Sequence, residues 1–149
     1  MRSVFVWGGA GLAAIAGAIV IVILIGLMLP VAHHVTKSRI FPVPRQLLWD
    51  MAIANFHRTN DGSYAIVEQR SPERLVTAIV KKGLPFGGNW VFEFASANGG
   101  TRLTITENGE IYTPFFRFVS RFILGYEGSI DAFFAALHEA ARKEKAPNR

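Results

Sequence analysis

The chain of 149 residues contains no cysteine, and its first part is almost without charge. Without thiols it has no disulfide framework, no thiolate zinc site and no cysteine nucleophile. No acidic or basic residue occurs between Ser3 and Thr36, whereas every charge except that of Arg2 lies from Lys37 onward. Half of the residues are hydrophobic and 18% are charged, a composition that excludes an intrinsically disordered chain.

The uncharged segment is apolar almost throughout, and residues 4–31 are long enough to cross a membrane. A helix rises about 1.5 Å per residue, so about 20 apolar residues span the hydrocarbon core. A cleavable signal peptide has a shorter apolar region of about 7–15 residues and a small-residue cleavage site, for which Pro30-Val31-Ala32 is a poor match. We therefore predict one uncleaved transmembrane helix over residues 4–31 and one domain over residues 34–145.

The charges that flank this segment predict its orientation. Only Arg2 precedes the span, whereas three basic residues follow it closely: Lys37, Arg39 and Arg45. Because basic residues are enriched on the cytoplasmic side, we expect a single-pass protein of the cell membrane with its domain in the cytoplasm.

Small residues repeat at four-residue spacing inside the span, at Gly9, Ala13 and Gly17. Such a stripe lets two membrane helices approach closely, and it predicts a homodimer. The competing interpretation is that alanine and glycine are simply common in membrane helices.

Patterning after the span predicts an α+β domain. A strand over residues 34–41 ends at two prolines, and a helix over residues 44–56 follows. Alternation with a period of two predicts strands at 64–69 and 74–82 and an antiparallel meander over 89–113, with Asn-Gly pairs at 98–99 and 108–109 as turn signals. A helix over 115–124 begins after Thr113-Pro114, and an amphipathic helix from Ser129 to about Lys145 covers one face of the sheet.

The order of several short segments resembles the START-like (SRPBCC) superfamily, the helix-grip fold of polyketide cyclases and lipid-transfer domains. These segments are residues 39–44 leading into Leu48-Trp49-Asp50, residues 85–90, residues 100–105, residues 114–118 and the terminal helix. The resemblance covers residues 34–145 and implies a curved antiparallel sheet that grips a long C-terminal helix around a hydrophobic cavity. It implies no single reaction, because the superfamily contains carriers, cyclases and hormone receptors. The domain is short for the superfamily, so its cavity is expected to be small or filled.

If the terminal helix grips the sheet, one stripe of that helix faces alternating residues of two strands. The predicted ligand-binding residues of this hydrophobic cavity are Trp90, Phe92, Phe94, Leu103, Ile105, Ile130, Phe133, Phe134 and Leu137. The function that follows is a membrane-anchored domain that binds a hydrophobic small molecule or lipid without catalysis. The alternative is a structural or interaction module in which these side chains fill a core, since burying each of them stabilises by about 1.5–3 kcal/mol.

Catalysis has less support in the sequence, and no catalytic residue, metal or cofactor is predicted. The four histidines form no His-x-x-x-His face, and the serines lack a nucleophile elbow. Acid–base candidates for a cyclase are Glu93, Glu107, Glu110 and Tyr112. The competing interpretation places them on the solvent face of the sheet, and Glu93 is opposite in phase to the neighbouring aromatic residues.

The net charge of +5 raises the question of nucleic acid as a partner. Acids interrupt the basic residues, which form no compact stripe, so we expect no nucleic acid and favour an anionic membrane surface. Residues 115–124 are apolar on most sides, with Arg117 and Arg121 one turn apart. They predict either a helix in the membrane interface or a cover packed on the domain's own core.

Overall fold

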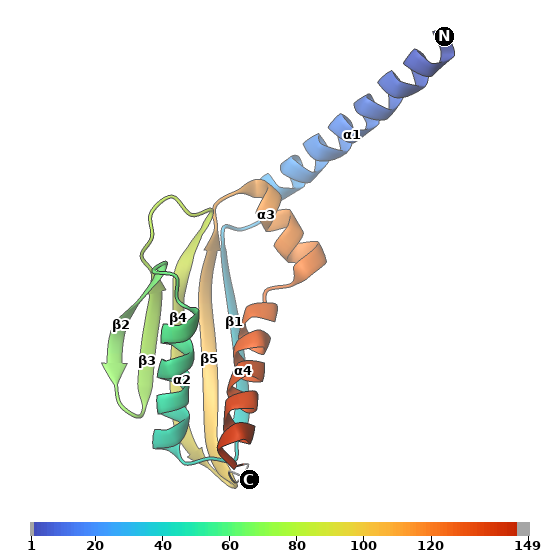
Figure 1. Ribbon diagram of the computed structural model, residues 1–149. Helices are drawn as coiled ribbons and strands as arrows, with labels where there is room; N and C mark the ends of the chain where they lie inside the picture. Colours follow the sequence, from blue (N-terminus) through green and yellow to red (C-terminus); the bar gives the residue numbers. More distant parts are fainter. Residues whose placement is uncertain (1, 146–149) are drawn as a thin grey trace.

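The computed structural model describes the backbone of residues 2–145 and the side chains of residues 13–144. Helix α1 (Arg2–Met28) projects from a domain built on one antiparallel sheet (Figure 1). The strands, in the spatial order β1-β5-β4-β3-β2, are β1 (Ala32–Phe41), β2 (Tyr64–Arg70), β3 (Arg74–Ile79), β4 (Phe86–Ala97) and β5 (Gly100–Ile111). The predicted α+β class, with an antiparallel sheet and a C-terminal helix, is confirmed.

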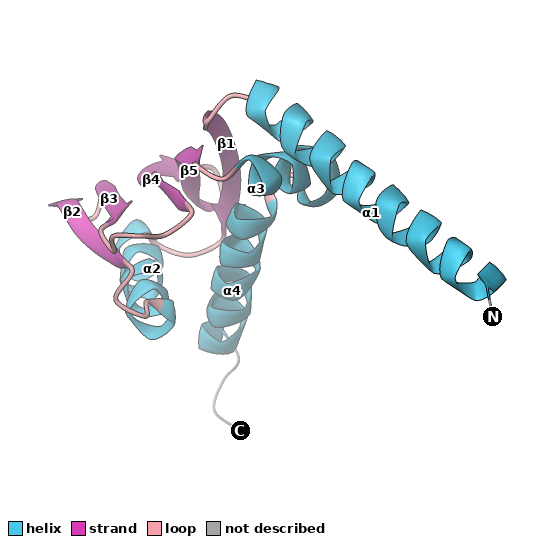
Figure 2. Cartoon of the chain, turned by 90° about the horizontal axis from the view of Figure 1, so that it is seen from above, coloured by secondary structure: helices cyan, strands magenta, loops and turns pink. Residues whose placement is uncertain are grey.

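Helices α2 (Arg45–Thr59) and α4 (Gly128–Lys145) lie on the same face of the sheet (Figure 2). The core forms between this face and the helices, because every second residue of β4 and β5 points toward them. The inward residues Phe92, Phe94, Leu103 and Ile105 are at most 3% exposed. Glu93 points the other way, and its Oε1 accepts a hydrogen bond from Arg74 at 3.0 Å. The predicted alternation of β4 is therefore confirmed.

The two Asn-Gly pairs have different roles. Asn98-Gly99 connects β4 to β5, as predicted, but Asn108-Gly109 lies inside β5, which pairs with β4 on one side and β1 on the other. A Cβ atom on Gly109 would collide with the ring of His33. Glycine is needed there because a side chain from the neighbouring strand covers it. The prediction of a turn at 108–109 was wrong for this reason.

The segment after β5 begins at Pro114 as predicted and consists of α3 (Pro114–Val119) and a π-helical turn, η1 (Ser120–Leu124). Arg117 of α3 is only 8% exposed. Its Nη1 donates to the carbonyl of Leu29 at 2.8 Å and its Nη2 to the carbonyl of Tyr112 at 3.2 Å. Arg117 thus ties the end of α1 to the end of β5, and it does not share an exposed face with Arg121 as the sequence suggested.

The predicted transmembrane segment forms most of α1, whose described side chains begin at residue 13. Among the side chains from 13 to 144, no helix is long and apolar enough to cross a membrane. Gly9 of the predicted dimer stripe lies outside these side chains. Ala13 and Gly17 are exposed, and a Cβ atom on Gly17 would meet nothing within 4 Å.

Candidate ligand-binding site

The nine predicted ligand-binding residues come together in the fold as a packed cluster. Seven of them are buried, and Trp90 and Phe133 are partly buried against the same cluster. The rings of Phe92 and Phe133 lie 5.2 Å apart, centroid to centroid. Of the nine, only Trp90 lines the apolar cavity at one end of the sheet, which is partly open to solvent. Ligand contact by the other eight stays a prediction.

That cavity has a volume of about 310 Å³. Its lining includes the start of β1 and the end of β5, which lie at the end of the sheet nearest α1 (Figure 1). Its apolar walls come from β3, the β3–β4 connection, β4, β5 and α3, through Ile79, Pro85, Phe86, Trp90, Ile111 and Phe116. Small-molecule sites have volumes of about 300–1,000 Å³ and mostly apolar walls. The cavity therefore fits a small ligand.

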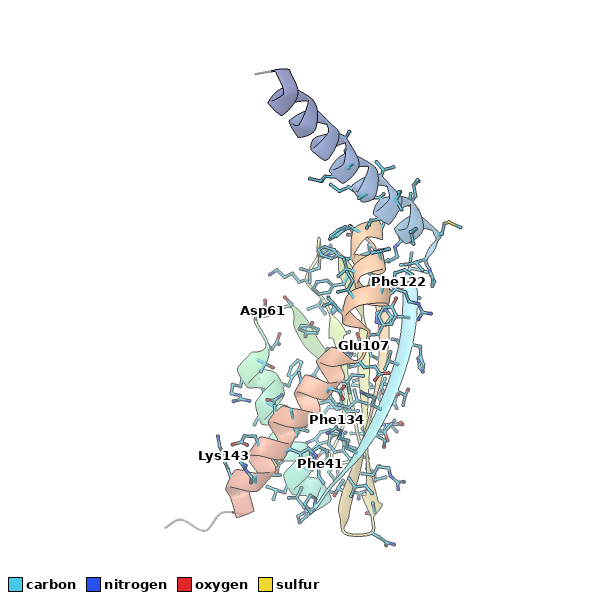
Figure 3. All side chains as sticks on the ribbon, turned by 90° about the vertical axis from the view of Figure 1, so that its right-hand side faces the viewer. Phe41, Asp61, Glu107, Phe122, Phe134 and Lys143 are labelled. Carbon is cyan, nitrogen blue, oxygen red and sulfur yellow. The ribbon has the colours of Figure 1, made fainter. Side chains whose placement is uncertain are left out.

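One wall of the cavity carries a polar cluster around Glu107. Its Oε2 accepts a hydrogen bond from Ser129 Oγ at 3.2 Å, and its Oε1 lies 3.4 Å from Nε2 of His33. The His33 ring stacks on Tyr126, with ring centroids 4.3 Å apart and an interplanar angle of 18°. The side chains of His33 and Glu107 are only 13% and 16% exposed. Figure 3 shows Glu107 closer to α1 than the buried Phe41 and Phe134.

The inward position of Glu107 contradicts the competing interpretation, which placed it on the solvent face of the sheet. Glu107 is in phase with Leu103 and Ile105, and these odd-numbered residues of β5 form its inner face. The alternation that excluded Glu93 from the interior would have placed Glu107 inside, so the signal was present in the sequence. Glu110 lines the same cavity but is exposed, and its Oε2 accepts the Tyr112 hydroxyl at 2.7 Å.

The phenol of Tyr64 responds to the carboxylates around it. Burial raises the pKa of the Tyr64 phenol above its usual range, and the charges of Glu107 and Asp61 raise it further. Tyr64, which also lines the cavity, therefore remains a protonated hydrogen-bond donor at neutral pH. Among the described residues, no three His, Asp or Glu side chains gather closely enough to hold a metal ion.

Comparison with known proteins identifies the fold. No protein-family model matches the sequence, and no curated protein matches it significantly. Matching solved structures include CalU16 from Micromonospora echinospora, with 14% identity, 78% of each chain covered and a TM-score of 0.56. An uncharacterised protein from Rhizobium leguminosarum has 11% identity over 75% of this chain and 97% of its own, with a TM-score of 0.57. A protein from Nitrosomonas europaea has 18% identity over 75% and 96%, with a TM-score of 0.53.

These neighbours share the helix-grip fold. At 11–18% identity the likeness concerns the fold and not the activity. The fold and the cavity together define a helix-grip protein with a partly open pocket beside a carboxylate.

Proposed function

We propose that the protein is a membrane-anchored helix-grip domain that binds a small, mostly apolar molecule in the cavity beside Glu107. The cavity itself carries this proposal, because it combines apolar walls with a few polar groups that can orient a ligand. In a purely structural core, we would expect side chains to fill such a space next to a charged group.

The anchoring part of the proposal is supported by the surface of α1. The helix has 27 residues, which at 1.5 Å each gives a length of about 40 Å, more than the hydrocarbon core of about 30 Å. Its described side chains are exposed and apolar on several sides, for example Ile15 at 61%, Leu24 at 56% and Met28 at 88%. Contact of so much apolar surface with water is unfavourable, so lipid is the environment that suits it.

A second apolar surface lies beside the end of α1. Gly26 touches the backbone of Pro114 so closely that a Cβ atom would collide with it. In η1, Phe122, Ile123 and Leu124 are 59%, 68% and 70% exposed, and Figure 3 shows Phe122 near the base of α1. With α1 in a membrane, η1 would lie at the lipid interface. The ligand cavity would then face the membrane end of the domain.

We expect the full-length protein to stay in the membrane fraction through high-salt and carbonate washes, because charge screening does not release a helix from hydrocarbon. Replacing Val20 by Lys places a charge near the middle of the span, where it costs about 2.5–3.5 kcal/mol, and should reduce retention. Release of the unaltered chain by carbonate would refute the anchor.

The orientation of the domain is tested separately with Asn98→Cys, in a chain that otherwise has no thiol. This cysteine should resist an impermeant thiol reagent in intact cells if the domain is cytoplasmic.

The full chain in lipid nanodiscs is expected to bind 1-naphthalenemethanol saturably at micromolar concentration, above the uptake of empty nanodiscs. Ile79→Trp, which enlarges a side chain of the cavity wall, should weaken binding at least tenfold because the ring then occupies the ligand's space. Val80→Trp is the matched control, because Val80 is 52% exposed and does not line the cavity. Isothermal titration calorimetry measures both. Binding that is no greater than to empty nanodiscs would contradict the proposal.

A second candidate function is acid–base catalysis in the same cavity, as in a polyketide-cyclase-like enzyme. The observation that favours it is the inward carboxylate of Glu107, with Tyr64 and His33 on the same cavity. Such groups catalyse only when they reach the proton to be transferred. Conversion of a bound substrate that stops in Glu107→Gln, while binding persists, would favour this function over binding alone.

A further inference from the structure

Two cationic side chains of the elements around the cavity, Lys37 and Arg117, are committed to other partners. The described cavity lining contains two carboxylates, Glu107 and Glu110, and neither lysine nor arginine. On β1, Lys37 Nζ lies 2.7 Å from carboxylate oxygens of both Glu127 and Asp131 at the start of α4. The buried Arg117 donates to backbone carbonyls. No fixed positive charge from these neighbours therefore neutralises Glu107.

Glu107 also accepts fewer hydrogen bonds than a carboxylate can. Two carboxylate oxygens offer about four acceptor positions, whereas Glu107 has one contact on each oxygen, from Ser129 at 3.2 Å and His33 at 3.4 Å. Charge-assisted bonds are shorter, at about 2.7–2.9 Å for a cationic nitrogen. A largely buried carboxylate with weak partners is costly, so a ligand that brings a further donor gains affinity there.

Aromatic side chains line the same cavity as Glu107. They include Trp90, Tyr126, Phe86 and Phe116, and the faces of such rings attract cations within about 6 Å. An ammonium group would be favoured both by the rings and by Glu107. A carboxylate or phosphate group in the same place would lose its hydration next to a like charge.

We infer that the ligand is a small amphiphile whose polar end is a hydrogen-bond donor, best a protonated amine, that binds the carboxylate of Glu107. Acidic amphiphiles such as fatty acids are excluded by the same group. This inference rests on the proposed binding function and names the chemical class of its ligand.

Three probes with one ring system and different polar ends test the inference: 1-naphthalenemethylamine, 1-naphthalenemethanol and 1-naphthoate. The full chain is placed in phosphatidylcholine nanodiscs without net lipid charge, at pH 7, and titrated calorimetrically with empty nanodiscs subtracted. We expect the amine to bind at least tenfold more tightly than the alcohol, and the carboxylate at least tenfold more weakly. Glu107→Gln should reduce the amine preference to less than threefold and improve carboxylate binding. Glu93→Gln makes the same charge change on the opposite face of the sheet and should leave the order unaltered.

The outcomes separate the inference from the function on which it rests. Carboxylate binding to the unaltered chain that equals or exceeds amine binding overturns the inference and leaves the cavity as a binding site. A preference for the amine that survives in Glu107→Gln, or disappears in Glu93→Gln, also overturns it. The order of the three probes on the unaltered chain remains a test even if Glu107→Gln fails to fold. Saturable binding of none of the three overturns the proposed function itself.

Discussion

Phe134→Ala is expected to lower the free energy of unfolding by about 3–5 kcal/mol, the range for such truncations in packed cores. Phe134 is fully buried between α4 and the sheet. The ring centroid of Phe134 lies 6.0 Å from that of Phe41 and 5.4 Å from the guanidinium carbon of Arg39. Removing the ring opens a space that strands and a helix cannot close, so dispersion contacts are lost on several sides. Urea unfolding of the full chain in detergent, followed by tryptophan fluorescence, measures the change.

Phe122→Ala is the matched control, because Phe122 is 59% exposed. We expect it to change the free energy of unfolding in detergent by no more than about 0.5 kcal/mol. A comparable loss in both variants would contradict the assignment of Phe134 to the core.

We expect Phe134→Leu to leave the domain folded, so this variant separates a core role from a ligand contact. If Phe134 serves only the core, the Leu variant loses stability and binds 1-naphthalenemethanol as the unaltered chain does. A changed affinity in the folded variant would place Phe134 in the ligand site, as the sequence predicted.

The elements of the sheet and the core were predictable because their signals are local. Phe92 and Phe94 alternate with Glu93, and the apolar stripe of α4 from Ile130 to Leu137 has helical spacing. Each pattern fixes a buried face without knowledge of its partner. The helix-grip arrangement was implied by the resemblance to the START-like superfamily, which rests on the order of the segments.

The position of the cavity depends on long-range geometry. The apolar stripe of α4 fills the space over the middle of the sheet. The segment just before α4, residues 125–127, has one aromatic side chain, Tyr126, and its ring stacks on His33. No local sequence pattern predicts that the end of the sheet nearest α1 keeps a cavity. The contact of His33 with Glu107 joins residues 74 positions apart and depends on the register of β1 and β5, in which His33 is opposite Gly109.

The second large effect on the free energy of unfolding is expected from Gly100→Ala. At the end of the sheet opposite the cavity, β1 and β5 approach each other closely at this residue. Gly100 has a φ of +146°, and a Cβ atom there would collide with the carbonyl oxygen of Phe41 and lie 2.9 Å from Cα of Pro42. Both obstacles are backbone and cannot rotate away. The backbone conformation alone costs about 1–3 kcal/mol for a residue other than glycine, and displacing the end of β1 adds to this. The next residue, Thr101, donates to the carbonyl of Val43 at 2.9 Å, and this buried bond would be strained by the same shift.

We therefore expect Gly100→Ala to lower the free energy of unfolding by more than about 2 kcal/mol, since strain and collision act together. Gly128→Ala is the control, because a Cβ atom there meets nothing within 4 Å; alanine at a compatible position changes stability by only about 0.4–1 kcal/mol. Both are measured by urea unfolding. Because the cavity lies at the opposite end of the sheet, folded Gly100→Ala should still bind 1-naphthalenemethanol with unaltered affinity. Equal stability of the two variants would show that the β1–β5 approach at Phe41 is looser than the structure places it.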